Sequence, residues 1–71
     1  MVARRFSANL RRLMADRDLS QSDLARAIPT VSQPAISQWL LGRNIPLADA
    51  VVALARFFRV STDELLGGRR R

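Results

Sequence analysis

The segment from residue 19 to residue 42 reads LSQSDLARAIPTVSQPAISQWLLG. Ser20 and Asp23 have the spacing of a short capping box, so a helix is predicted to start there. Pro29 ends that helix, because proline disfavours helical geometry in the residue before it. Ser32 is the predicted N-cap of a second helix, and Gly42 is its left-handed stop. The segment therefore predicts two short helices joined by a turn.

The two faces of the second predicted helix differ in character. Its inward stripe consists of Ile36, Trp39 and Leu40. Its outward face is mostly polar and consists of Gln33, Ser37, Gln38 and Leu41. Two short helices with a proline-containing turn, the second anchored inward by Ile and Trp, form a helix-turn-helix pattern.

Three more helices are predicted around this pair. The first spans about residues 5–17, with an apolar face made of Phe6, Leu10, Leu13 and Met14. Another follows Pro46, with an inward stripe made of Leu47, Val51, Leu54, Ala55 and Phe58. The last starts at a capping box of Ser61 and Glu64 and is closed by Gly67. No segment alternates with a period of two residues, so the fold class is all-α, a compact five-helix bundle.

The composition excludes several classes of function. Among the 71 residues there is no His and no Cys, which removes thiol and imidazole chemistry, disulfides and Cys/His zinc sites. We expect neither an enzyme nor a cofactor or metal, because the six acidic residues are scattered and so short a chain has little room for a pocket. No membrane span or signal peptide is predicted, so a cytoplasmic protein is expected.

The positive charge predicts a polyanionic partner. All twelve basic residues are Arg, and the net charge is +6. Guanidinium groups bind phosphates and guanine edges through two points. A GC-rich genome would also favour Arg over Lys, but codon usage does not explain the excess of positive over negative charge.

The chain resembles the phage repressor and Cro type (XRE-like) of helix-turn-helix DNA-binding proteins. The resemblance rests on residues 19–25, 31–39 and 54–66, together with Gly42 and Pro46. It implies a lambda-repressor-like domain over residues 6–66. A basic N-terminal arm (residues 1–5) and a basic C-terminal tail (residues 67–71) are expected to flank it.

The resemblance also implies roles for individual residues. Base readout is assigned to Gln33, Ser37, Gln38 and Ala35. Both glutamines have the donor and acceptor that pair with adenine N6 and N7, and Ala35 would touch a thymine methyl. DNA backbone contacts are assigned to Gln21, Ser32, Arg43, Asn44 and Arg12. Arg4 and Arg5 are possible arm contacts, while a solvated tail is favoured for residues 69–71. The alternative for the glutamines is a solvated polar face.

Three features depart from the family pattern. One extra residue lies between Ala25 and Ile36, so the turn must bulge and the start of the second helix shifts by up to one residue. Asp18 stands where the family often has Gly, and Asp tolerates the left-handed conformation. Met14 and Leu40 replace a charged pair of the family, so we predict that these two side chains pack together.

The expected function is sequence-specific double-stranded DNA binding by a transcriptional regulator, Cro-like or a phage or prophage repressor. A homodimer is expected on a pseudo-palindromic operator with half-sites about 34 Å apart. Phe57 is the first candidate for a dimer contact, followed by Val52, Leu41 and Leu65. One alternative is a DNA-binding antitoxin with a toxin as protein partner. Another is a basic nucleic-acid coater with little sequence preference.

Overall fold

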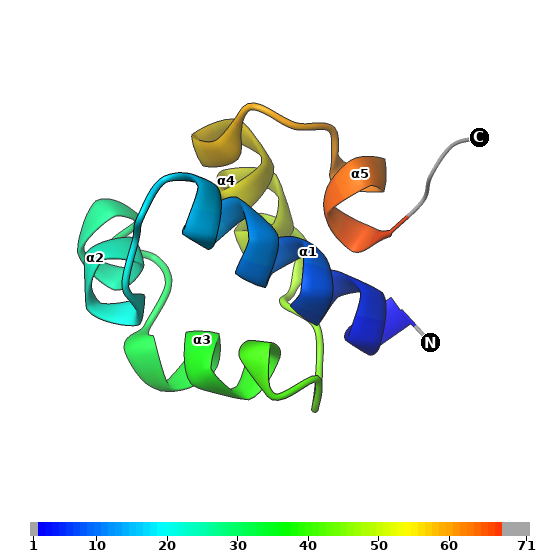
Figure 1. The fold of residues 1–71 in the computed structure, drawn as a ribbon, viewed down its shortest axis with the longest axis horizontal. Coiled ribbons are helices and arrows are strands. Elements are labelled where there is room, and N and C mark those ends of the chain that lie inside the picture. Colours follow the sequence, from blue (N-terminus) through cyan, green and yellow to red (C-terminus); the bar gives the residue numbers. More distant parts are fainter. Residues whose placement is uncertain (1, 68–71) are drawn as a thin grey trace.

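The computed structural model describes residues 2–67, with only the backbone of Val2. Its elements are α1 (Val2–Asp16), α2 (Gln21–Ala27), α3 (Gln33–Leu40), α4 (Ala48–Phe58) and α5 (Thr62–Leu66). α1 crosses the middle of the molecule, with α3 on one side and α4 and α5 on the other (Figure 1). The described residues contain no strand, so the prediction of an all-α, five-helix fold is confirmed.

The core collects apolar side chains from all five helices. The largest fully buried ones are Phe6, Leu10, Leu24, Ile36, Leu54 and Leu65. The ring of Phe6 meets Trp39 edge to face, with 5.9 Å between the ring centres. Such an aromatic pair stabilises a core beyond the area it buries. It also fixes the inward side of α3 against α1, which determines the side of α3 that faces outward.

Serine side chains cap three of the helices at their N-termini, as the sequence predicts. The Ser20 hydroxyl accepts from the backbone N–H of Asp23, and the Asp23 carboxylate accepts from that of Ser20, both at 3.0 Å. Ser61 and Glu64 form the same reciprocal pair. The hydroxyl of Ser32 accepts from the N–H of Ala35 at 3.2 Å. These bonds satisfy amides that lack a partner within the helix, and they fix where each helix begins.

Within residues 2–67 four helices end near a residue with a positive φ, Gly67 of α5 among them, and three of these helices share one hydrogen-bonding arrangement. The residue beyond the end has a positive φ in each case: 56° at Asp18, 75° at Gly42 and 59° at Arg59. The next amide bonds the carbonyl five residues back, from Leu19, Arg43 and Val60 to Met14, Gln38 and Ala55 respectively. This is the bonding pattern of a Schellman motif. The left-handed conformations expected at Asp18 and Gly42 are confirmed, and Arg59 adopts one although it is neither Gly, Asn nor Asp.

Polar side chains of α1, and of Arg17 just after its end, bind the C-terminal carbonyls of three other helices. At the end of α3, the Leu40 carbonyl accepts from Ser7 Oγ at 2.8 Å and from Arg11 Nη2 at 2.6 Å. At the end of α5, Asn9 Nδ2 donates to the carbonyls of Glu64 and Leu65. Arg17 does the same at the end of α4. α1 therefore connects the ends of the bundle as well as filling its core.

Two expectations about the helices are wrong. α1 begins at Val2, so Arg4 and Arg5 lie within its first turns and not in a separate arm. Leu47 is 83% exposed, although it was expected in the inward stripe of α4. Leu47 is the N-cap, with extended backbone angles of −70° and 166°, and therefore precedes the helix whose stripe it was expected to join. Pro46 is buried next to it.

The longer turn between α2 and α3 bulges outward while its two ends stay anchored. Ile28 and Val31 are buried, and the Val31 amide bonds the Ile28 carbonyl at 2.9 Å. Pro29 and Thr30 between them are exposed. Because the bulge is confined to those two residues, α3 begins at Gln33, as the Ser32 cap predicts.

Candidate nucleic-acid interface

α2 and α3 pack against each other, and α3 is held with its polar side outward. Its buried residues are Ile36 and Trp39, and Leu40 packs against the core. Met14 belongs to the same core, but its direct contact with Leu40 stays a prediction. Ala25 on α2 is half-buried against this cluster, as expected for the small residue between two crossing helices. The packing leaves Gln33 exposed and Ser37 and Gln38 half-buried.

The side chain of Gln33 is bonded to α2. Ser22 Oγ donates to Gln33 Oε1 at 3.3 Å, and both residues are exposed. Gln33 is the first residue of α3, and Ser22 is the second residue of α2. This contact spans the turn and was not anticipated from the sequence.

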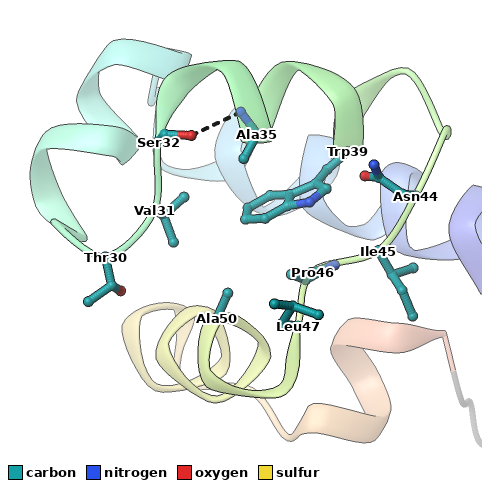
Figure 2. Close-up of a pocket in the computed structure, with 10 residues that line it drawn as sticks. All are labelled: Thr30, Val31, Ser32, Ala35, Trp39, Asn44, Ile45, Pro46, Leu47 and Ala50. Carbon is teal, nitrogen blue, oxygen red and sulfur yellow. Dashed lines mark hydrogen bonds between the residues drawn. The ribbon is translucent and has the colours of Figure 1, made fainter.

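Ala35 does not share a face with the three polar candidates. It lies on the side of α3 that carries Trp39 and lines a cavity of about 320 Å³ between α3 and the segment leading into α4 (Figure 2). It is half-buried and packs against the core. Ala35 shares the side of α3 that carries Trp39, four residues on, and this orientation does not favour the predicted contact with a thymine methyl, which stays a prediction.

The candidates for backbone contacts surround the exposed side of α3. Arg43 and Asn44 are exposed in the loop after Gly42, and Asn44 also lines the cavity. Ser32 is exposed; its oxygen accepts the capping bond, which leaves the hydroxyl hydrogen to donate. Gln21 is half-buried as the first residue of α2. Arg12 is exposed on α1.

The N-terminal cap of α2 lowers the pKa of the acidic residue in its first turn, Asp23. The backbone N–H of Ser20 donates to the Asp23 carboxylate, and together with the Ser20 hydroxyl it holds the pKa of Asp23 below its ordinary value. Arg26 contributes in the same direction with a smaller effect. Asp23 would be ionised at neutral pH even at its ordinary pKa, and its negative charge suits the positive end of the helix.

Of the two terminal Arg clusters, the structure describes the N-terminal one, Arg4 and Arg5. A Cβ built on Gly67 would lie 2.5 Å from the Cβ of Arg5, so the aliphatic stem of Arg5 packs against the end of α5. Arg4 is exposed on the first turn of α1. Residues 69–71 lie outside the described part of the chain. Because Arg5 packs at the α1–α5 junction, its side chain is less free to reach DNA than that of Arg4.

The apolar candidates for a dimer contact have different exposures. Leu65 is fully buried, so the expectation that it offers interface area is wrong: its position in the capped α5 directs it into the core. Phe57 is half-buried and packs against the core. Val52 is 43% exposed and Leu41 is 61% exposed. Among the described residues, Leu47 is the most exposed large apolar side chain, and the sequence pattern did not predict its exposure.

Comparisons with known proteins agree with this geometry. A family model described as helix-turn-helix matches residues 10–65. The HTH-type transcriptional activator BcrR of Enterococcus faecalis is 36% identical over 63 residues, which are 89% of this chain and 30% of that protein. The chain thus spans less than a third of the length of that relative. No solved structure matches the chain. Within residues 2–67, no helix has the length and apolar character to cross a membrane.

Proposed function

The chain belongs to the helix-turn-helix family, and we propose that it is a transcription regulator that binds double-stranded DNA sequence-specifically. The observation that carries this proposal is the outward side of α3. A helix fixed by buried Ile36 and Trp39 presents polar side chains, above all Gln33 and Gln38, on the side away from the core. A helix with this arrangement fits the major groove, where amide side chains can bond base edges.

We propose that α3 enters the major groove and that its neighbours bind phosphates. Gln33, Ser37 and Gln38 contact base edges. Backbone contacts come from the surrounding residues Gln21, Ser32, Arg43, Asn44 and Arg12. Phosphate contacts supply most of the affinity and its salt dependence, while the base contacts select the sequence. Each two-point base contact discriminates by about 1–3 kcal/mol.

The rigidity of α3 supports this function. Its C-terminal carbonyl at Leu40 is bonded by Ser7 and Arg11, its end is closed by left-handed Gly42, and its start is capped by Ser32. A reading helix held at both ends presents its side chains in one orientation, which reduces the ordering cost of binding. Arg11 thus serves the interface indirectly, by holding α3.

We further propose that the protein binds a pseudo-palindromic operator as a homodimer. One α3 helix reaches only a few base pairs. In a dimer bound to half-sites about 34 Å apart, the two α3 helices would enter successive major grooves on the same face of the duplex. Val52 and Leu47 are the exposed apolar residues proposed for the dimer contact. Phe57 contributes less than its sequence position suggests, since it is half-buried. Sedimentation of Leu47→Gln and Val52→Gln, with and without operator, tests this contact.

Selection of bound duplexes from a random pool, at two salt concentrations, tests DNA binding and symmetry together. We expect an enriched motif with two-fold symmetry. Gln38→Ala should remove the base preference at one position in each half-site while the variant keeps its helical circular dichroism. Binding without any enriched motif would instead identify a nucleic-acid coater. A stable complex with a host protein, recovered without a DNA footprint, would identify the antitoxin alternative.

The direction of regulation depends on where the operator lies. A bound protein that overlaps a promoter blocks polymerase, which is the arrangement of the proposed Cro-like or prophage repressor. The relative from Enterococcus faecalis is named an activator, so both repression and activation have to be tested for this chain. A reporter gene behind the selected operator, measured with and without the protein, gives the sign directly: repression supports the proposal and activation overturns its repressor part.

A further inference from the structure

The cavity between α3 and the segment that leads into α4 has room for a small molecule. Its volume is about 320 Å³. An apolar protein cavity of about 150 Å³ already holds benzene. So short a chain leaves little room for a pocket, and here the bulged turn before α3 supplies part of the wall through Thr30. A ring with a substituent therefore fits the space.

The lining of the cavity is uncharged. Within the part of the chain that the structure describes, no lining residue is Arg, Asp or Glu, although 25% of the whole chain is charged. Most of the lining is apolar, including the Trp39 ring and Pro46 (Figure 2). The polar side chains are Thr30, Ser32 and Asn44. An ion would lose hydration here without gaining an opposite charge, so the lining favours an uncharged ligand.

The indole N–H of Trp39 needs an acceptor from outside the described chain. Trp39 is only 6% exposed, and no group of residues 2–67 accepts a hydrogen bond from its side chain. Figure 2 shows the indole nitrogen on the edge of the ring that is turned toward the loop carrying Ile45 and Pro46. A buried Trp N–H ordinarily donates to an acceptor. That acceptor has to belong to whatever occupies the cavity.

Asn44 brings a second polar group to the same cavity. Figure 2 shows its side-chain amide directed toward the Trp39 ring. Among residues 2–67 no group forms a hydrogen bond with that amide. An amide NH₂ donates, as the indole N–H does, so one oxygen atom with two lone pairs can accept from both side chains.

We propose that this cavity binds a small, uncharged aromatic molecule that carries a carbonyl oxygen. The oxygen accepts from the indole N–H of Trp39 and from the amide of Asn44. The ring fills the apolar part of the cavity, where Val31 and Ala50 form the wall. This binding needs no DNA and goes beyond the proposed function.

One consequence of the ligand site does rest on the proposed function. Asn44 lines the cavity and is also one of the proposed contacts to the DNA backbone. A ligand that bonds the Asn44 amide takes that group from a phosphate. Ligand and DNA should therefore weaken each other's binding, and by the same factor, because coupling between two binding equilibria is reciprocal.

The single Trp of the chain gives a direct measurement of the site. Trp39 contributes the indole N–H peak of a nitrogen–proton correlation spectrum, and acetophenone is the probe. Cumene has nearly the same shape but no acceptor, and benzoate adds a negative charge. We expect acetophenone to shift the indole peak until saturation and to bind about threefold to tenfold more tightly than cumene, the effect of one hydrogen bond. Benzoate should bind more weakly than acetophenone.

Three variants connect the measured shift with the cavity. Ala50→Leu fills the cavity and should abolish acetophenone binding. Ala53→Leu is the matched control on the same helix, because Ala53 is also half-buried but lies outside the lining of the cavity. Asn44→Ala should weaken acetophenone binding and leave cumene binding unchanged. Circular dichroism shows whether each variant keeps the helical fold.

Several results would overturn the inference. These are the absence of a saturable shift, equal affinities for acetophenone and cumene, and acetophenone binding that survives in folded Ala50→Leu. If no probe binds and Ala50→Leu changes the sedimentation of the chain, a second copy occupies the cavity, which also overturns it. Unchanged operator affinity in saturating acetophenone overturns the link to DNA alone. A chain that binds no DNA would refute the proposed function and leave the acetophenone measurements valid.

Discussion

The guanidinium of Arg17 lies 5.4 Å from the ring centre of Phe57 and donates a 3.0 Å hydrogen bond to the carbonyl of the same residue. It makes the same two contacts with Phe58, at 5.3 Å and 3.2 Å. One side chain thus covers two rings and bonds two carbonyls at the end of α4. Phe57, which looked free for a dimer contact, is instead part of the junction between α1 and α4.

Replacement of Arg17 by Met should destabilise the fold by about 1–3 kcal/mol, because Met keeps an apolar stem but loses the charge and both donors. Arg17→Lys should fall between Met and the unmodified chain: Lys keeps a charge over the rings but lacks the planar fork that reaches two carbonyls. The free energy of unfolding in urea measures both changes.

Arg12→Met is the matched control for that series. Arg12 is an exposed arginine on α1, the helix that Arg17 directly follows, and a surface substitution of this kind changes stability by no more than about 0.5 kcal/mol. Equal losses for Arg12→Met and Arg17→Met would show that net charge, and not the contact with α4, determines the effect.

Arg59→Gly should raise stability by about 0.5–1 kcal/mol, which corresponds to several degrees in Tm. Arg59 has a φ of 59°, a left-handed conformation that strains a residue with a Cβ, and glycine removes that strain at some cost in chain entropy. Asp18→Gly should give a smaller gain, since Asp tolerates this conformation better.

Gly42→Ala is the reverse experiment at the end of α3. A Cβ at Gly42 would meet no atom within 4 Å, so the loss of about 1 kcal/mol that we expect comes from the φ of 75° alone. If Arg59→Gly proved destabilising while Gly42→Ala behaved as expected, the Arg59 side chain would have to contribute a contact that outweighs the backbone strain.

Local sequence patterns predicted the helices of this bundle well, and they failed where tertiary contacts decide the outcome. The caps at Ser20, Ser32 and Ser61 depend on neighbours three residues away, so spacing alone reveals them. The bonds from α1 to the ends of other helices join residues 29–56 positions apart, and an exposed Arg on a helix gives no sign of such a partner.

The candidate site shows the same division. Helical periodicity correctly placed Gln33, Ser37 and Gln38 opposite Ile36 and Trp39. The same periodicity places Ala35 with Trp39, four residues on, whereas the family resemblance implies a base contact for Ala35. The bond between Ser22 and Gln33 crosses the bulged turn, whose shape depends on both Ile28 and Val31 being buried. No local pattern encodes that geometry.

Acid should selectively remove the contribution of Asp23 to stability. Its pKa is lower in the folded chain, through the bonds with Ser20, so the ionised form favours folding. The contribution is complete above the unfolded value, near 4, and disappears as the pH falls through the lowered folded value. The difference in Tm between the unmodified chain and Asp23→Asn should therefore shrink between about pH 5 and pH 2. In a Ser20→Ala background that change should be smaller, because the hydroxyl bond is gone.

Arg43 and Arg12 should affect affinity for all DNA sequences alike. Both are exposed and are proposed to neutralise phosphates, and each phosphate contact adds about one unit to the slope of log affinity against log salt. Arg43→Gln and Arg12→Gln should each lower that slope by about one per subunit, without change in the selected motif. Arg56→Gln on α4 is the control with the same change in charge, and its slope should stay close to that of the unmodified chain. If all three variants lowered the slope equally, the positive charge would act through the overall field of the protein and not through individual phosphate contacts.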